Sequence, residues 1–169
     1  IKTIQQLSKI CINTYEKNKI STVIKHIPGH GLAKLDSHKK LPIINKNINF
    51  LLKNDFKCFQ NSKSFFAMTA HILFKNIDSK NCATHSKKII KDLIRKKIKY
   101  RGIIISDDIS MKSLKYGIVE NALKALKAGC NLALYCSGSS KESLKLLENI
   151  PPIDEFTRKK TSEFYKFLR

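Results

Sequence analysis

Histidine, carboxylate, glycine and proline residues are concentrated in one fourteen-residue segment of the chain. The segment reads K-H-I-P-G-H-G from Lys25 and continues to D-S-H at residues 36–38. Proline and glycine disfavour a regular helix, so these side chains are expected on a loop. A histidine close to a carboxylate can donate and accept protons near neutral pH, and catalytic loops often carry such groups. We therefore interpret Asp36 and His38 as a candidate acid–base pair; a solvated polar loop is the alternative.

The same segment offers four side chains of the types that bind zinc: His26, His30, His38 and Asp36. The usual helical His-x-x-x-His arrangement is blocked by Pro28 and Gly29. No glycine-rich dinucleotide fingerprint and no G-x-S-x-G nucleophile signature is present. We therefore expect neither a metal nor a cofactor.

A second pair of carboxylates, Asp107 and Asp108, ends the apolar run I-I-I-S. Successive side chains of a strand point to opposite faces, so at most one of the two faces a central site. A structural role is available for Asp108, as the cap of a helix that begins near Met111. No comparable structural role is evident for Asp107, which makes it the stronger candidate for chemistry.

Charge and cysteine content narrow the function classes. The formal net charge is +20, but only four of the 33 basic residues are arginine, the residue that base and phosphate recognition favours. Nucleic acid is therefore not an expected partner. The chain has five cysteines and no C-x-x-C, which favours a reducing cytoplasm over a disulfide framework or a thiolate zinc site. No apolar run approaches the roughly 18 residues of a membrane span, so a membrane is not an expected partner either.

Helix and strand patterns alternate along the chain. Apolar residues spaced by three and four predict helices at residues 4–19, 86–98, 116–128, 140–149 and 153–168. Short apolar or β-branched runs predict strands at residues 21–27, 64–72, 102–106 and 131–136, with a short helix or irregular segment at 45–57. Nearly continuous apolar strands are typical of a parallel sheet buried on both faces. The predicted class is α/β, and either an open doubly wound sheet or part of a (β/α)8 barrel fits the pattern.

Several long motifs, in order, resemble those of family 3 glycoside hydrolases, and most closely the bacterial β-N-acetylhexosaminidases of peptidoglycan recycling. The motifs are K-H-I-P-G-H-G…D-S-H-K-K-L-P, A-M-T-A-H-I-L-F-K-N-I-D with the following A-T-H-S, R-G-I-I-I-S-D-D-I-S-M, and A-L-K-A-G-C-N-L-A-L-Y-C. The resemblance extends from roughly Thr22 to Pro151. It implies a (β/α)8 barrel, of which residues 1–169 form one partial domain with four βα units, about the C-terminal half.

The resemblance also implies a reaction and the residues that perform it. The family hydrolyses terminal N-acetyl-β-D-glucosamine in two steps through a covalent glycosyl-enzyme. By position in the motifs, Asp107 is the nucleophile, His38 the acid–base residue and Asp36 its partner. Lys25 and His26 match the pair that binds sugar hydroxyls. A muropeptide containing N-acetylglucosamine is then the expected substrate, and a histidine replaces the second carboxyl group of the usual glycosidase scheme.

The length of the chain leaves a second reading open. The family's N-terminal barrel strands are not among these residues, and a half barrel exposes sheet edges and apolar surface. We therefore expect a missing N-terminal half, a partner chain or self-association to complete it. The alternative to an enzyme is an inactive remnant or split-gene fragment that keeps the motifs without the activity.

Overall fold

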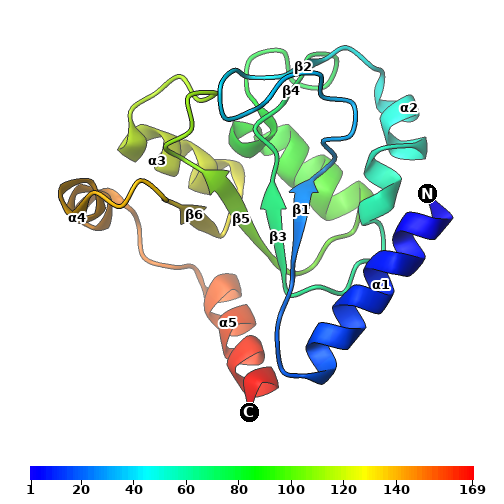
Figure 1. Ribbon diagram of the computed structural model, residues 1–169. Helices are drawn as coiled ribbons and strands as arrows, with labels where there is room; N and C mark the ends of the chain where they lie inside the picture. The colour runs from blue at the N-terminus through cyan, green and yellow to red at the C-terminus, as the bar shows by residue number, and fades with distance from the viewer.

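A four-stranded parallel sheet forms the centre of the computed structural model, which describes residues 1–169 (Figure 1). In spatial order the strands are β1 (Val23–Ile27), β3 (Phe66–Thr69), β5 (Ile103–Asp108) and β6 (Leu132–Leu134). This order follows the chain and has no point of reversal, whereas a doubly wound sheet reverses its strand order at its binding crevice. The sequential order is that of a (β/α)8 barrel, and four strands make up half of one.

Helices connect and flank these strands. The α-helices are α1 (Lys2–Lys17), α2 (Ile48–Lys53), α3 (Ile118–Ala128), α4 (Ser140–Asn149) and α5 (Glu155–Leu168). Two 3₁₀ turns, η1 (Phe56–Phe59) and η2 (Ala83–His85), and one π-helix, η3 (Lys88–Lys97), complete the set. No helix is long and apolar enough to cross a membrane.

The two faces of the sheet are covered unequally. On one face Ala67 and Ile104 are fully buried, in one apolar cluster with Ile90 and Ile94 of η3, which runs behind the sheet in Figure 1. This burial is the main source of apolar stabilisation in the fold. On the other face Phe66, Met68 and Ile105 are only partly buried, and Val23 on the outer strand is 42% exposed. That face is the one that a closed barrel would enclose.

Most predicted elements are confirmed with small changes in their bounds. The helix predicted at residues 140–149 has the same bounds as α4, and Gly129 ends α3 in the left-handed conformation (φ +119°) that its position predicts. The helix predicted at 86–98 is present, but as a π-helix. Two residues of types that cap helices, Thr84 and Ser86, lie at its start. The Ser86 hydroxyl accepts a hydrogen bond from the Ile89 N–H (3.1 Å), whereas the Thr84 side chain points into the core.

A second, smaller sheet was not predicted. The two short strands β2 (Ile43–Ile44) and β4 (Leu73–Phe74) form a second parallel sheet above the carboxyl ends of β1 and β3 (Figure 1). The long predicted strand at 64–72 is therefore β3 followed by a break. The small sheet thus pairs the end of the His-rich loop, which follows β1, with the start of the segment that follows β3.

Candidate active site

A pocket of about 570 Å³ lies at the carboxyl ends of β1 and β5. The five residues to which the family resemblance gives roles all line it: Lys25, His26, Asp36, His38 and Asp107. The other lining residues are His30, Gly31, Ser37, Asp55, Cys58 and Phe59. In a parallel α/β fold this is the edge at which loops and strand ends build sites.

A bulge in β1 places two consecutive side chains in this pocket. Lys25 pairs with Met68 and Ile27 with Thr69, so that His26 is an extra residue on its strand. A regular strand would send neighbouring side chains to opposite faces, but a bulge re-aims one of them. Both Lys25 and His26 therefore line the pocket.

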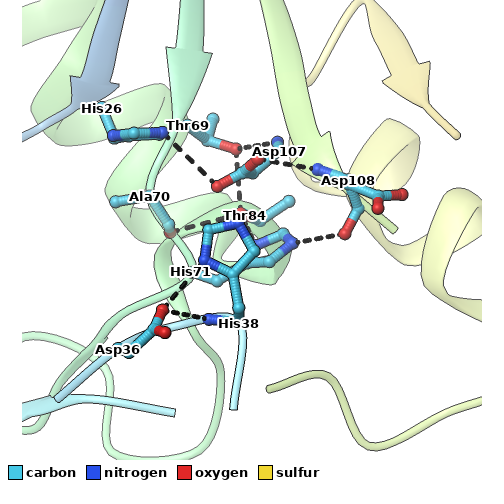
Figure 2. Close-up of polar contacts among 9 residues, drawn as sticks. All are labelled: His26, Asp36, His38, Thr69, Ala70, His71, Thr84, Asp107 and Asp108. Atoms are coloured by element: carbon cyan, nitrogen blue, oxygen red, sulfur yellow. Dashed lines mark hydrogen bonds and ion pairs between the residues drawn. The ribbon is translucent and has the colours of Figure 1, made fainter. Parts of the chain in front are cut away.

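The β5 strand presents Asp107 to the same pocket (Figure 2). Its Oδ2 lies 3.6 Å from Nε2 of His26, and its Oδ1 accepts a hydrogen bond from the Asp108 N–H (2.9 Å). The side chain is 14% exposed. The register of β5 against β6 shifts between Ile105 and Asp108, so this strand too is irregular where it carries the pocket residue Asp107.

Burial lowers the pKa of His26, and the neighbouring Asp107 carboxylate opposes that shift. Burial is the larger of the two causes. At neutral pH the imidazole is therefore uncharged, and it can offer one donor and one acceptor to a ligand in the pocket.

Asp108 has a structural role, as the sequence suggested, but not the one expected. Its carboxylate accepts hydrogen bonds from the N–H groups of Ser110 (3.0 Å) and Cys136 (3.1 Å) and from the Ser110 hydroxyl (2.6 Å). It thus caps a turn and ties the segment after β5 to the segment after β6. The expectation of a helix near Met111 was wrong, because the next helix begins at Ile118.

Asp36 and His38 form the expected pair on the loop that follows β1. Nδ1 of His38 lies 2.9 Å from Oδ1 of Asp36, which also accepts the His38 backbone N–H (3.0 Å). These hydrogen bonds from His38, the backbone one first, lower the pKa of Asp36. With Nδ1 directed at the carboxylate, Nε2 is free to transfer a proton. The His38 side chain is 78% exposed and the Asp36 side chain 53%. No hydrogen bond joins either of them to Asp107 (Figure 2).

Asp55 is a pocket residue that the sequence reasoning did not find. Its Oδ1 accepts the Gly31 N–H (3.3 Å), and burial raises the pKa of its carboxyl group. A Cβ atom on Gly29 would lie 2.5 Å from Asp55 Oδ2, so the glycine permits this close approach. The signal for Asp55 was weak, because the contact spans 24 residues and the surrounding sequence has no motif of its own.

No group of three or more histidine, cysteine, aspartate or glutamate side chains is arranged to hold a metal ion. The Asp36–His38 pair, called the dyad below, and the His26–Asp107 pair are two separate polar groups. Side chains of these types can take part in acid–base and nucleophilic catalysis.

Comparison with known sequences decides the family. Residues 1–158 match the profile described as the glycosyl hydrolase family 3 N-terminal domain. The chain belongs to glycosyl hydrolase family 3. It is 33% identical over 162 residues to a β-hexosaminidase of Haemophilus influenzae, which covers 89% of the chain and 46% of that relative. A β-hexosaminidase of Mannheimia succiniciproducens is 31% identical, with 95% and 49% covered. The chain thus spans about half the length of the curated relatives that it matches.

Solved structures of family 3 enzymes agree with this assignment. A β-N-acetylglucosaminidase from Paenibacillus sp. str. FPU-7 superposes with a TM-score of 0.79 at 26% identity, over 92% of this chain and 32% of that one. NagZ from Neisseria gonorrhoeae in complex with N-trifluoroacetyl-D-glucosamine gives 0.75 at 25% identity, over 90% and 43%. The family 3 fold confirms the barrel interpretation of the sequential parallel sheet.

Proposed function

We propose that the protein hydrolyses terminal, non-reducing N-acetyl-β-D-glucosamine residues of peptidoglycan-derived muropeptides, with retention of configuration and through a covalent glycosyl-enzyme. The observation that carries this proposal is the pocket in which Asp107 and His26 meet Lys25 and the Asp36–His38 dyad. The β-hexosaminidase relatives and the N-trifluoroacetyl-D-glucosamine complex of a family 3 neighbour support the sugar class.

In the first step the Asp107 carboxylate attacks the anomeric carbon as the bond to the leaving oxygen breaks. The protonated His38 ring gives its proton from Nε2 to that oxygen, while the Asp36 carboxylate balances the charge of the ring at Nδ1. The products of this step are the free leaving group and an ester between the sugar and Asp107.

In the second step the now neutral His38 accepts a proton from water, whose oxygen attacks the same carbon. The ester bond breaks, Asp107 leaves as a carboxylate and His38 is protonated again. Lys25 and the neutral His26 donate hydrogen bonds to sugar hydroxyls and hold the ring over Asp107. Two inversions at one carbon give net retention.

The surroundings of the reaction belong to the same proposal. The outer edges of β1 and β6 have no neighbouring strand, so we expect further barrel strands, from the same protein or from a partner, to pair with them. All five cysteines are free, which supports a reducing compartment such as the cytoplasm.

The test uses protein expressed from the complete reading frame that encodes residues 1–169. We expect it to hydrolyse 4-nitrophenyl N-acetyl-β-D-glucosaminide, to release the β-anomer first by NMR, and to lose at least about 10³-fold of its turnover in Asp107→Asn. Release of the α-anomer first would refute retention. No hydrolysis by the wild-type protein would favour the inactive remnant instead, whereas an Asp107→Asn variant as active as the wild type would refute Asp107 as the nucleophile.

A further inference from the structure

Three fully buried polar side chains, Thr69, Thr84 and His71, form a hydrogen-bonded chain that contacts the backbone of Asp107 and Asp108 (Figure 2). The Asp107 N–H donates to Thr69 Oγ1 (3.3 Å), and Thr69 Oγ1 lies 2.8 Å from Thr84 Oγ1. Thr84 Oγ1 lies 2.7 Å from Nδ1 of His71, whose Nε2 lies 3.0 Å from the Asp108 carbonyl oxygen. The Thr–Thr–His chain therefore starts at the N–H of Asp107 and ends at the carbonyl of Asp108, the next residue of β5.

The backbone groups at the two ends of the chain determine which atom of each hydrogen-bonded pair is the donor. A carbonyl oxygen only accepts, so Nε2 of His71 carries the hydrogen. Burial lowers the pKa of His71, and a neutral imidazole with a hydrogen on Nε2 has an acceptor at Nδ1. Thr84 therefore donates to Nδ1, with the Ala70 carbonyl as a longer alternative at 3.3 Å, and Thr69 donates to Thr84. Each donor in the chain then has an acceptor.

The Thr–Thr–His chain acts where the sheet itself is irregular. The register between β5 and β6 shifts between Ile105 and Asp108, and the Asp107 N–H bonds to the side chain of Thr69 rather than to a strand carbonyl. A buried backbone donor or acceptor without a partner is unfavourable, and the pairing of β3 with β5 ends at Met68 and Ile105. These side chains therefore supply the partners that the strand ladder does not provide at Asp107 and Asp108. They do so at the residue whose carboxylate faces the pocket.

We propose that Thr69, Thr84 and His71 are positioning residues, which hold the backbone of Asp107 and Asp108 so that the Asp107 carboxylate stays aimed at the anomeric carbon. None of the three lines the pocket, so none is expected to touch substrate. This inference rests on the proposed function, in which Asp107 is the nucleophile. Misplacement of a reacting group by about 1 Å can cost on the order of 100-fold in rate.

The proposal is tested with Thr84→Val, which keeps the shape of the side chain and removes its hydroxyl. We expect kcat on 4-nitrophenyl N-acetyl-β-D-glucosaminide to fall about 10- to 100-fold with KM within about twofold. Thr84→Ser keeps the hydroxyl and should retain kcat within about threefold. Thr157→Val is the matched control: its hydroxyl is also buried and accepts a hydrogen bond from Asn131 (2.9 Å), but it lies on α5, away from the pocket.

A second measurement needs no variant and no activity. Nitrogen NMR of the wild-type protein should show His71 neutral at pH 7, with its hydrogen on Nε2. A hydrogen on Nδ1 would overturn the proposal, as would a Thr84→Val variant that is folded and has the kcat of Thr157→Val. If Thr84→Val does not fold, Thr69→Val breaks the next link and is held to the same criterion. Absence of hydrolysis by the wild-type protein would refute the proposed function. A hydrogen on Nδ1 of His71 would refute only the positioning role of the Thr–Thr–His chain.

Discussion

Nε2 of His26 lies 3.6 Å from Oδ2 of Asp107, although the two residues come from strands β1 and β5 that are separated in the sheet by β3. The bulge at His26 brings its ring over the neighbouring strand end. The pair thus combines a neutral hydrogen-bonding ring with the carboxylate that we propose as nucleophile.

His26→Ala is expected to lower kcat/KM about 10- to 100-fold, because a lost hydrogen bond to a sugar hydroxyl costs about 1–3 kcal/mol. Steady-state kinetics on the aryl N-acetylglucosaminide measure the effect. His85→Gln is the control, since His85 is also partly buried but does not line the pocket. An unchanged kcat/KM in His26→Ala would remove this residue from the sugar site.

His38→Ala is expected to affect substrates according to their leaving groups. An alkyl or sugar leaving oxygen needs the proton from His38, so its release should slow by about 10²- to 10⁴-fold, whereas 4-nitrophenolate needs little help in leaving. Single-turnover rates for the two kinds of substrate give the comparison. Lys39→Ala, an exposed neighbour on the same loop that does not line the pocket, should change neither rate. Equal losses on both substrates would argue against His38 as the acid.

Much of this site is local in sequence, and that part could be predicted. The His-rich loop and the D-S-H pair lie within fourteen residues, and the carboxylates 107 and 108 follow directly on an apolar strand. Alternation of side chains in that strand predicted that at most one of the two carboxylates faces a central site, and Asp107 lines the pocket whereas Asp108 does not. The helical period likewise predicted α4 with its observed bounds.

The missed features depend on contacts between distant residues or on very short elements. Strands of two residues, such as β2 and β4, are too short to show a period. The role of Thr84 could not be predicted, because its partners, Thr69 and His71, are thirteen to fifteen residues away and meet it only in the folded core. Asp55 reaches the loop at Gly31 through tertiary packing alone.

The unfolding free energy is expected to fall as the pH drops below about 6.5, the value of an unfolded histidine. Burial lowers the pKa of His85 to about 4, and it also lowers those of His26 and His71. The folded state therefore leaves these rings neutral at a pH where the unfolded chain protonates them. The stability that these neutral histidines contribute is fully present above about pH 6.5. It is lost as the pH falls from about 6.5 to the pKa of each ring in the folded state, which is about 4 for His85.

Urea unfolding at pH 7.5 and pH 5.0 measures this loss, which can reach about 1.4 kcal/mol per pH unit for each histidine. His85 is the most direct case, because its Nε2 is buried without a hydrogen-bond partner. His85→Gln should therefore lose less stability than the wild type between the two pH values. An equal or greater loss in the variant would show that His85 does not contribute.

Gly102 precedes β5 at a point where the backbone packs against the core without room for a side chain. A Cβ atom there would clash with the Tyr100 hydroxyl group and lie 2.5 Å from the Phe65 carbonyl oxygen. Tyr100 cannot move freely, since it is 2% exposed and its hydroxyl donates to the Ser64 carbonyl (3.0 Å). Gly102→Ala is therefore expected to lower the unfolding free energy by about 1–3 kcal/mol, as overpacking does in other cores.

The control for Gly102→Ala is Gly117→Ala. No heavy atom lies within 4 Å of the Cβ position at Gly117, and its φ of −65° suits any residue. This variant should stay within about 1 kcal/mol of the wild type, because a modest loss of N-cap preference is offset by the lower entropy of the unfolded chain. Urea midpoints of the two variants, compared at one pH, separate a steric effect at Gly102 from a general effect of removing glycine. Equal shifts in both would contradict the packing account, because only Gly102 faces backbone and a buried ring at this distance.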